Sequence, residues 1–220
     1  MPTIGDADVV VAPTASNASI AAPAGPPVIV IPGGEVTAAV FVLSGVVSGQ
    51  PLALFFGNVQ TTGLPTGVSD TFQTPYTWTL VQSATNLIAG ALYIGTGGKG
   101  SSGTVTVTCA SSIVGGVVIP LLGASTAAAL AAVDVSGNNS GSSTTATLSL
   151  TPTATGEFAF YATVNDNGGL SAYPAYPWSD NNLAGTISEA SYINPPAAAL
   201  AANWTQTTGP WITLGMVIKA

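Results

Sequence analysis

The sequence contains very few charged side chains, and their scarcity excludes several kinds of partner. Only 5% of the 220 residues are charged, against about 25% in an average soluble domain. There is no arginine, and Lys99 and Lys219 are the two lysines. Nucleic-acid binding depends on basic side chains that neutralise phosphates, and anionic membrane surfaces attract the same residues. We therefore expect neither nucleic acid nor a membrane as a partner.

Histidine is absent as well, and this removes most catalytic architectures. A nucleophilic triad needs a base, and a zinc site needs several cysteines or histidines, whereas Cys109 is the single cysteine. Glycosidases work with two carboxylates alone, and Glu157, Asp180 and Glu189 are acids that might supply such a pair. Nearby basic groups that normally bind substrate and tune such acids are missing. We therefore expect no enzymatic activity, no catalytic residue and no cofactor.

Two short segments contain oxygen ligands of the kind that calcium accepts. They are residues 165–169 (NDNGG) and 179–182 (SDNN). Asparagine, aspartate and glycine also form turns without a metal, because their side chains bond to the backbone or tolerate unusual backbone angles. We interpret both segments as surface turns, with calcium as the alternative, and assign no metal ligand.

The sequence carries no clear membrane or secretion signal. Residues 113–133 are uncharged and long enough for a membrane span, but glycine, proline and polar residues divide them. Two buried strands joined by a turn are the better interpretation. The first residues include acids where a signal peptide has a basic region, so we expect synthesis in a cytoplasm without a signal peptide. A composition rich in Thr, Ser, Gly and Val nevertheless suits a protein outside cells, and a virion component satisfies both observations.

The pattern of the chain is that of an all-β protein. Residues 1–26 are rich in proline, alanine and serine, and we predict an extended N-terminal arm there. From residue 27 onward, short β-branched runs alternate with turn residues about every 8 to 12 positions. This spacing predicts, for residues 27–220, a two-sheet β-sandwich of jelly-roll type with about ten to twelve strands.

Particular segments give more local predictions. Residues 95–102 (GTGGKGSS) resemble a phosphate-binding loop, but Lys99 is followed by Gly100 and then by a strand instead of a helix. We therefore predict a glycine-rich hairpin loop there. Residues 127–135 and 144–150 read as two separate strands, and residues 212–218 as the last one. Residues 195–202 (PPAAALAA), preceded by Asn194 as a cap, are the one helix candidate.

An aromatic segment is the best candidate for a contact site. Tyr173, Tyr176 and Trp178 alternate with prolines and are followed by Asp180 and Asn181. Aromatic rings beside amides and carboxylates can stack on sugars and bond to their hydroxyl groups. Tyrosine and tryptophan are equally enriched at protein interfaces. We interpret the segment as packing or subunit contact, with a glycan site as the alternative.

The order of the strand-like segments resembles a known kind of protein. The segments are 48–57 (SGQPLALFFG), 76–83 (YTWTLVQS), 91–97 with 104–108 (ALYIGTG and TVTVT), 133–137 (VDVSG), 145–164 (TATLSLTPTATGEFAFYATV) and 203–220 (NWTQTTGPWITLGMVIKA). In this order they resemble the jelly-roll-type β domains of bacteriophage head-decoration, fibre and minor tail proteins, and of some bacterial surface proteins. The resemblance covers roughly residues 36–220 and implies no shared catalytic residues.

These features together predict a structural protein of a virion, a capsid decoration or fibre component. It would form a homo-oligomer and bind other virion subunits through its arm and through apolar strand edges. Two alternatives remain. One is a carbohydrate-binding or adhesin module that uses the aromatic segment, and the other is a subunit of an extracellular filament or surface layer.

Overall fold

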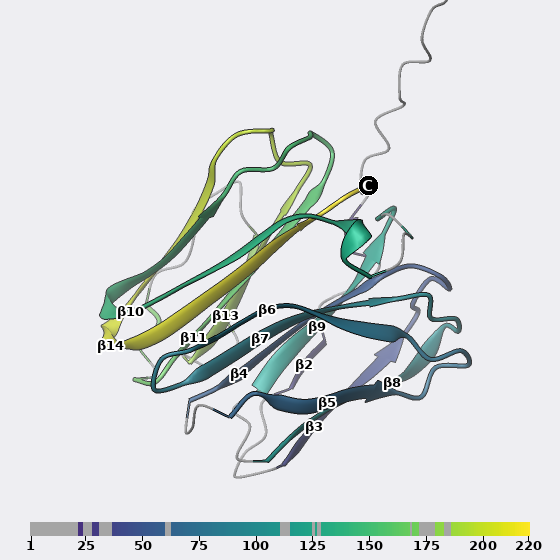
Figure 1. The fold of residues 1–220 in the computed structure, drawn as a ribbon, viewed down its shortest axis with the longest axis horizontal. Helices are drawn as coiled ribbons and strands as arrows, with labels where there is room; N and C mark the ends of the chain where they lie inside the picture. Colours follow the sequence, from purple (N-terminus) through teal and green to yellow (C-terminus); the bar gives the residue numbers. More distant parts are fainter. Residues whose placement is uncertain are drawn as a thin grey trace, which may run out of the picture.

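The computed structural model describes residues 22–23, 28–30, 37–59, 63–110, 115–124, 126, 129–167, 169–171, 179–182 and 186–220. These residues form fourteen strands and one short 3-10 helix, η1 (Ala129–Ala132). Every strand pair is antiparallel, and the strands make up three sheets (Figure 1). The all-β class expected from the sequence is confirmed, with three sheets in the described residues instead of the expected two.

The central sheet has six strands and lies in the middle of the molecule. They are β1 (Ala22–Pro23), β2 (Val28–Val30), β4 (Leu52–Asn58), β6 (Thr77–Thr85), β7 (Ala89–Thr96) and β9 (Gly115–Leu122). Their order is β1-β9-β4-β7-β6, and β2 pairs with β9 on the same edge as β1. The end of the predicted N-terminal arm, Ala22 and Pro23, is thus paired with the edge of this sheet.

The outer sheet covers one face of the central sheet. It consists of β3 (Ala38–Ser44), β8 (Ser102–Cys109) and β5 (Pro65–Asp70), in the order β3-β8-β5. Its strands alternate because only one face is covered: Phe41 and Leu43 are buried, while Val40 and Val42 are exposed. The inward side chains pack against β4 and β7 in one hydrophobic core.

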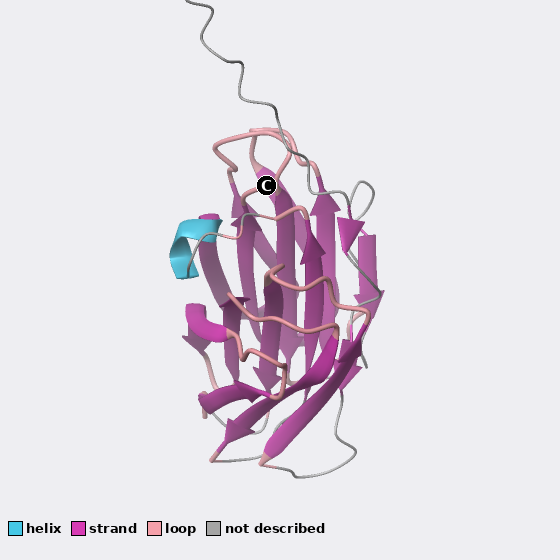
Figure 2. Ribbon diagram, turned by 90° about the vertical axis from the view of Figure 1, so that its right-hand side faces the viewer, coloured by secondary structure: helices cyan, strands magenta, loops and turns pink. Residues whose placement is uncertain are grey.

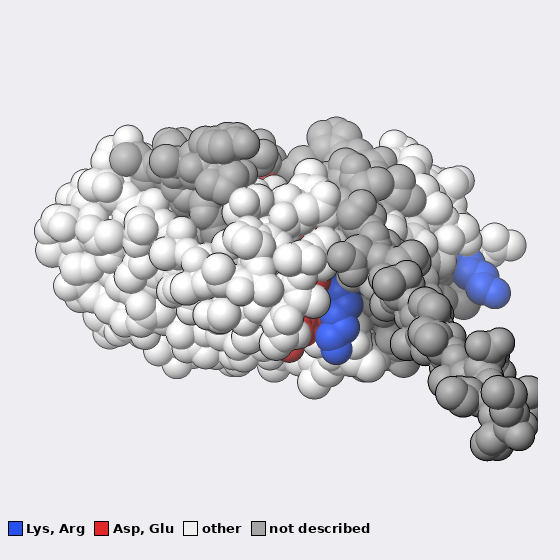
Figure 3. Space-filling model, turned by 90° about the horizontal axis from the view of Figure 1, so that it is seen from above, with Lys and Arg blue, Asp and Glu red and all other residues white. Residues whose placement is uncertain are grey.

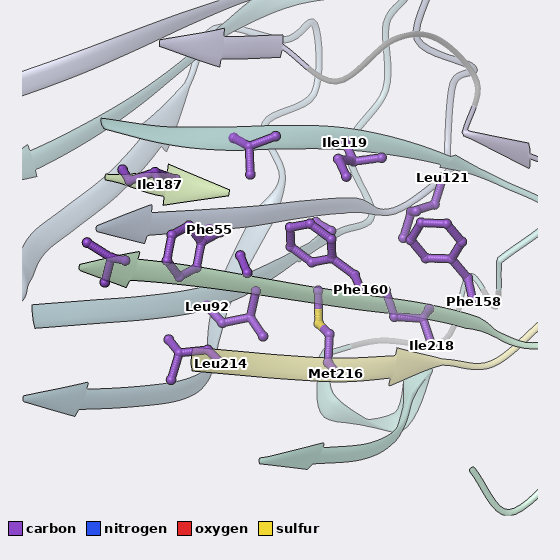
Figure 4. Close-up of a cluster of buried hydrophobic side chains, with 14 of the residues drawn as sticks. Phe55, Leu92, Ile119, Leu121, Phe158, Phe160, Ile187, Leu214, Met216 and Ile218 are labelled. Carbon is purple, nitrogen blue, oxygen red and sulfur yellow. The ribbon is translucent and has the colours of Figure 1, made fainter. Parts of the chain in front are cut away.

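The C-terminal sheet covers the opposite face of the central sheet. Its strands are β10 (Val133–Leu150), β11 (Phe158–Asn165), β12 (Ser179–Asn182), β13 (Ile187–Ile193) and β14 (Leu200–Ile218), in the order β10-β14-β11-β13-β12. Phe55 and Leu92 of the central sheet meet Phe160 and Met216 of the C-terminal sheet in a second core (Figure 4). The central sheet is therefore buried on both faces.

The two longest strands bend and add a further layer. β10 and β14 pair along most of their length, with a register shift between Ser143 and Thr145. Beyond the bend, residues 145–150 and 200–205 form a two-stranded unit, the folded-back ribbon, which packs its inner side chains over the other face of the C-terminal sheet (Figure 1). Trp204, fully buried, packs there with Tyr161 in the third core.

Burial on both faces explains the continuous apolar runs of some strands. All residues of β4 (LALFFGN) and β11 (FAFYATVN) are buried. Strands covered on both faces have no solvent side, so their sequences show no alternation of polar and apolar residues. Such runs mark the middle layers of this molecule, whereas alternating runs mark its outer layers.

The central and C-terminal sheets are also joined along one edge by side chains. Gln82 Nε2 on β6 donates to Ser136 Oγ on β10 at 3.0 Å, and Asn138 Nδ2 donates back to Gln82 Oε1 at 3.0 Å. Near the end of β6, Asn86 Nδ2 donates to the carbonyl oxygen of Gly141 at 2.9 Å. These amides satisfy polar groups at two strand edges that would otherwise face each other without hydrogen bonds.

The structure corrects several local predictions. Residues 195–202 contain no helix, because Leu200 to Ala202 belong to β14 and pair with β10. The predicted strands at 127–135 and 144–150 are replaced by η1 and one long strand, β10, whose central residues 136–143 find partners on β14. Figure 2 shows the short helix beside the strands that fill the described chain. Within the described residues, no helix has the length and apolar character needed to cross a membrane.

Candidate functional site

The residues of the predicted aromatic segment are only partly placed by the structure. Tyr173, Tyr176 and Trp178 lie outside the described residues. The backbones of Asp180 and Asn181 belong to β12, at the edge of the C-terminal sheet, and pair with Ala190 and Glu189. A glycan or interface contact by this segment therefore stays a prediction.

Two of the three acids considered for a glycosidase pair, Glu157 and Glu189, are not brought together, and the side chain of Asp180 lies outside the described parts. Glu157 immediately precedes β11, whereas Glu189 lies in the middle of β13 opposite Ala162, several residues further along the sheet. Both side chains are buried, with 3% and 0% of their surface exposed. Glu157 and Glu189 thus occupy separate places in the interior and do not face a common substrate position.

Glu157 instead belongs to a cluster that the sequence did not reveal. Asp134, Glu157 and Lys219, here called the terminal cluster, come from three neighbouring strands. β14 is the middle strand, and its Ile218 pairs with Val133 on β10 and with Phe158 on β11. The next residue, Lys219, therefore aligns with Ala132 and Glu157, and Asp134 follows Val133 at the same end of the sheet. One lysine is seen beside acidic side chains in Figure 3.

A backbone irregularity places Asp134 in this cluster. Val133 pairs with Ile218 and Val135 with Val217, so Asp134 is the extra residue of a bulge. Bulges redirect the side chain of the extra residue. The Asp134 carboxylate accepts hydrogen bonds from the backbone nitrogen of Thr153 at 2.7 Å and from its hydroxyl group at 2.5 Å.

The Lys219 side chain is held at the same end of the sheet. Its backbone nitrogen donates to the carbonyl oxygen of Ala132 at 3.0 Å. Its Nζ donates to the carbonyl oxygen of Ala131 at 3.2 Å. The C-terminal strand is thereby fastened to η1, directly before β10 begins.

The electrostatics of the terminal cluster separate the two acids. Burial, together with the charge of Asp134 and a hydrogen bond to it, raises the pKa of Glu157 to about 7. Burial opposes ionisation of Asp134 too, but hydrogen bonds from Thr153 and Glu157 outweigh it and lower the Asp134 pKa. Among the described residues, Glu157 Oε2 has no hydrogen-bond partner. Glu157 therefore keeps its proton to a higher pH than an ordinary glutamate, beside an aspartate that ionises more readily than usual.

A second polar arrangement, around Asp70, holds the aromatic residues that enter β6. Asp70 accepts hydrogen bonds from the backbone nitrogens of Phe72 and Tyr76 at 3.2 and 3.0 Å, and from Trp78 Nε1 at 2.9 Å. Burial and the charge of Asp70 raise the pKa of Tyr76 to about 12, and its hydroxyl group donates to the Gln50 carbonyl oxygen. The arrangement fixes a loop and offers no reactive group.

The glycine-rich segment connects two layers and is not a hairpin. β7 belongs to the central sheet and β8 to the outer sheet, so residues 97–101 cross between them. Lys99 exchanges two backbone hydrogen bonds with Thr74, and the Tyr76 ring lies so close to Gly98 that a Cβ atom there would overlap it. Gly98 has no side chain, so the Tyr76 ring can pack directly against it. Together with the bonds to Thr74, this contact directs the chain away from β7.

Neither turn-like segment forms a recognisable metal site in the described residues. These residues contain no group of three or more His, Cys, Asp or Glu side chains suited to a metal ion. Asn165 is buried in β11, while Asn167 is exposed and donates to the Thr208 carbonyl oxygen at 2.5 Å, beside the bend of β14. Residue 168 and the side chains of residues 179–182 lie outside the described parts, so calcium there remains the untested alternative.

Most of the described charges are gathered in a few polar groupings, so little of the described surface carries charge. Seven charged side chains are described: Asp70, Lys99, Asp134, Glu157, Asp166, Glu189 and Lys219. Glu189 is buried, Asp70 is occupied by three donors, and three others form the terminal cluster. Within the described residues, only Lys99 and Asp166 stand exposed outside these groupings. Figure 3 accordingly shows a face on which charged side chains are sparse.

Asp134 and Lys219 were missed by sequence reasoning because nothing connects them along the chain. The available signal was a charged residue within or next to a strand-like run. VDVSG, GEFAF and VIKA each contain such a residue. In a chain with so few charges, three such positions are conspicuous.

Comparison with protein families, with curated proteins and with solved structures gave no match.

Proposed function

We propose that this chain is a structural protein of a virion, a capsid decoration or fibre component that binds other subunits through uncharged β surfaces. The observation that carries the proposal is the outward face of the outer sheet. Val40 and Val42 on β3 are 46% and 69% exposed there. They lie opposite Thr106 and Thr104 on β8. This face combines apolar and hydroxyl side chains on a regular strand surface.

The edges of the outer sheet strengthen this proposal. Within the described residues, β3 and β5 are the end strands of their sheet, and each pairs on one side with β8. Soluble proteins usually protect such edges with charged side chains, prolines or covering loops. The residues of β3 (AAVFVLS) include neither charge nor proline. An edge strand without charge or proline, beside a face of apolar and hydroxyl side chains, suits strand pairing or face packing with another subunit.

The N-terminal strands support the part of the proposal that concerns the arm. β1, within the arm, and β2, just after it, are short pieces that join the edge of β9 in the same chain by backbone hydrogen bonds. Chain segments of this kind bind through backbone pairing, so their affinity does not depend on charge. The proposal includes the β-sandwich of jelly-roll type that the sequence predicts, with the arm binding a neighbouring subunit.

Particle incorporation tests the proposal directly. In particles made from a genome that encodes this chain, quantitative mass spectrometry should find it in a fixed ratio to the capsid protein. Deleting residues 1–26 should remove the chain from particles, since the arm is then lost. A control deletion of residues 1–5 should leave incorporation unchanged. Absence of the wild-type chain from particles would refute the virion role, and normal incorporation of the deletion variant would refute the role of the arm.

Electron microscopy of the purified chain distinguishes the alternative assemblies. A closed oligomer is expected for a decoration or fibre component, whereas long polymers or sheets would indicate a filament or surface-layer subunit. A glycan array with the wild type and with Trp178→Ala addresses the adhesin alternative. Binding that Trp178→Ala removes would favour that alternative over the virion role.

A further inference from the structure

The carboxyl groups of Asp134 and Glu157 adjoin each other at one end of the C-terminal sheet. Their side chains are linked by a hydrogen bond. Glu157 is only 3% exposed, and its Oε2 has no hydrogen-bond partner among the described residues. A buried polar atom without a partner is costly, and an unsatisfied one calls for an explanation. This oxygen belongs to the carboxyl group that contacts Asp134, so a ligand bound to it would lie beside both acids.

The chain holds both carboxyl groups in position without a ligand. The bulge of β10 redirects Asp134, and its two oxygens accept hydrogen bonds from the nitrogen and the hydroxyl group of Thr153. The loop from β10 reaches Glu157 through Gly156, whose φ of 85° is readily adopted by glycine. The carbonyl oxygen of Glu157 accepts a hydrogen bond from the Asn194 nitrogen at 2.9 Å. Contacts from a bulge, a loop and a turn therefore place the two acids side by side.

The nearby lysine does not occupy the space between these acids. Lys219 aligns with Glu157 across the sheet, but it is exposed and its Nζ donates to the carbonyl oxygen of Ala131. Its charge acts on both acids through space. Two ionised carboxylates carry more negative charge than one lysine offsets, so the pair still attracts a cation.

We propose that Asp134 and Glu157 bind a calcium ion. Carboxylates are the hard oxygen ligands that calcium accepts, and each has about four lone-pair positions, so the bonds from Thr153 leave room on Asp134. The described residues contain no group of three or more acidic, histidine or cysteine side chains, so water at the half-buried Asp134 completes the shell. Calcium tolerates such irregular shells and bidentate carboxylates. Magnesium keeps several waters in an octahedral arrangement, for which the buried Glu157 leaves little space.

The ion would connect separate parts of this end of the molecule. Asp134 lies at the start of β10, Thr153 in the following loop, and Glu157 directly before β11. These groups come together through strand pairing, so the folded chain binds the ion and the unfolded chain does not. Binding of this kind stabilises the folded state by mass action. The site is independent of the virion role.

Thermal unfolding of the full-length chain with and without calcium tests the proposal. The chain is first treated with a chelator and studied at about pH 8, above the pKa of both acids. About 10 mM calcium chloride should then raise the Tm of the wild type by roughly 5 °C, relative to sodium chloride of equal ionic strength. Asp134→Asn and Glu157→Gln keep the size of the side chain and remove one charge each, so both should lose the shift. A wild-type Tm that calcium leaves unchanged would overturn the proposal.

Matched controls separate this site from the two turn-like segments. Asp166→Asn and Asp180→Asn each remove one acid from NDNGG or SDNN, and both should keep the full shift. Loss of the shift in either control, with the shift retained in Asp134→Asn, would place the ion in that turn and overturn the proposal. Isothermal titration calorimetry should find one calcium ion per wild-type chain and an affinity at least about tenfold lower in Glu157→Gln, with its fold checked by near-ultraviolet circular dichroism. Equal affinity in that variant would overturn the role of Glu157.

Discussion

Asp70 shows how one carboxylate can organise a loop in a chain with few charges. It accepts hydrogen bonds from two backbone nitrogens and from Trp78 Nε1, so its removal leaves three donors without a partner. Hydrogen bonds to charged groups contribute about 1.5–3 kcal/mol each in favourable cases, and less where water can reach them. Asp70→Ala should therefore lower the free energy of unfolding by about 2–4 kcal/mol.

Urea unfolding followed by tryptophan fluorescence measures this effect, because Trp78 is one of the donors. The matched control is Asp166→Ala, since Asp166 is exposed and its backbone nitrogen makes the hydrogen bond with the Pro210 carbonyl oxygen. This control should change the free energy of unfolding by less than about 0.5 kcal/mol. Equal effects of the two substitutions would contradict the role assigned to Asp70.

The raised pKa of Glu157 predicts that the stability of the chain depends on pH. Its pKa is about 7 in the folded chain and lies near the ordinary value of 4.5 in the unfolded chain. The folded state therefore binds the proton more tightly, and its advantage is lost as the pH rises through the folded pKa. In the wild-type chain, the free energy of unfolding should therefore fall between about pH 5 and pH 8. Glu157→Gln should remove most of that fall.

Denaturant titrations at several pH values measure the wild type and Glu157→Gln. Asp134 does not confuse the result, because its lowered pKa places its own effect at more acidic pH. If Glu157→Gln shows the same fall as the wild type, another group is responsible, and the shifted pKa of Glu157 is wrong.

At the scale of elements, the folded-back ribbon depends on one tyrosine of the strand beneath it. The Tyr161 hydroxyl group donates to the Leu200 carbonyl oxygen and accepts from the Leu150 nitrogen, both at 3.2 Å. Tyr161→Phe removes both bonds and leaves the ring in place. Two lost bonds of about 1 kcal/mol each should speed amide exchange in residues 145–150 and 200–205 by roughly tenfold or more.

Hydrogen exchange monitored by mass spectrometry on peptides resolves this local effect. The control Tyr93→Phe changes a tyrosine that packs in the core between the outer and central sheets. It should leave exchange in the ribbon unchanged. If Tyr161→Phe accelerates exchange equally in all strands, the ribbon unfolds together with the whole molecule and has no separate stability.

The elements also show which parts of the fold the sequence predicts. β3 alternates as AAVFVLS requires, because one of its faces meets solvent. Residues 136–143 (SGNNSGSS) consist of turn-forming residue types, yet they form the middle of β10 because β14 supplies hydrogen-bond partners across the sheet. Leu200 and Ala202 likewise join a strand in place of the predicted helix, since alternate residues reach the third core. Long-range pairing thus overrides local preference.

At the scale of the whole molecule, the number of sheets was predicted less well than the fold class, because two were expected and the described residues form three. The continuous apolar runs of β4 and β11 indicate strands buried on both faces, but they do not say what covers each face. The terminal cluster was equally out of reach, because the pairing of β10, β14 and β11 is what brings Asp134, Glu157 and Lys219 to the same end of the sheet. The scarcity of charge, in contrast, can be read directly from the composition, and it explains why few of the described surface side chains are charged.

The outward face of the outer sheet leads to a prediction about assembly. Contacts between exposed charges weaken as salt screens them, whereas apolar and backbone contacts do not. If the outward face of the outer sheet binds other copies, the dissociation constant of the oligomer should change less than about threefold between about 0.05 and 0.5 M salt. Val42→Lys should weaken association strongly, since Val42 is 69% exposed on that face and a buried unpaired lysine is unfavourable. Ser149→Lys, on the outer side of the folded-back ribbon, is the matched control and should associate normally.

Sedimentation velocity at several salt concentrations measures the wild type and both lysine variants. A steep loss of association with salt would mean that the few charges, and not the uncharged face, hold the oligomer together. Equal weakening by both lysine substitutions would place the contact elsewhere on the molecule.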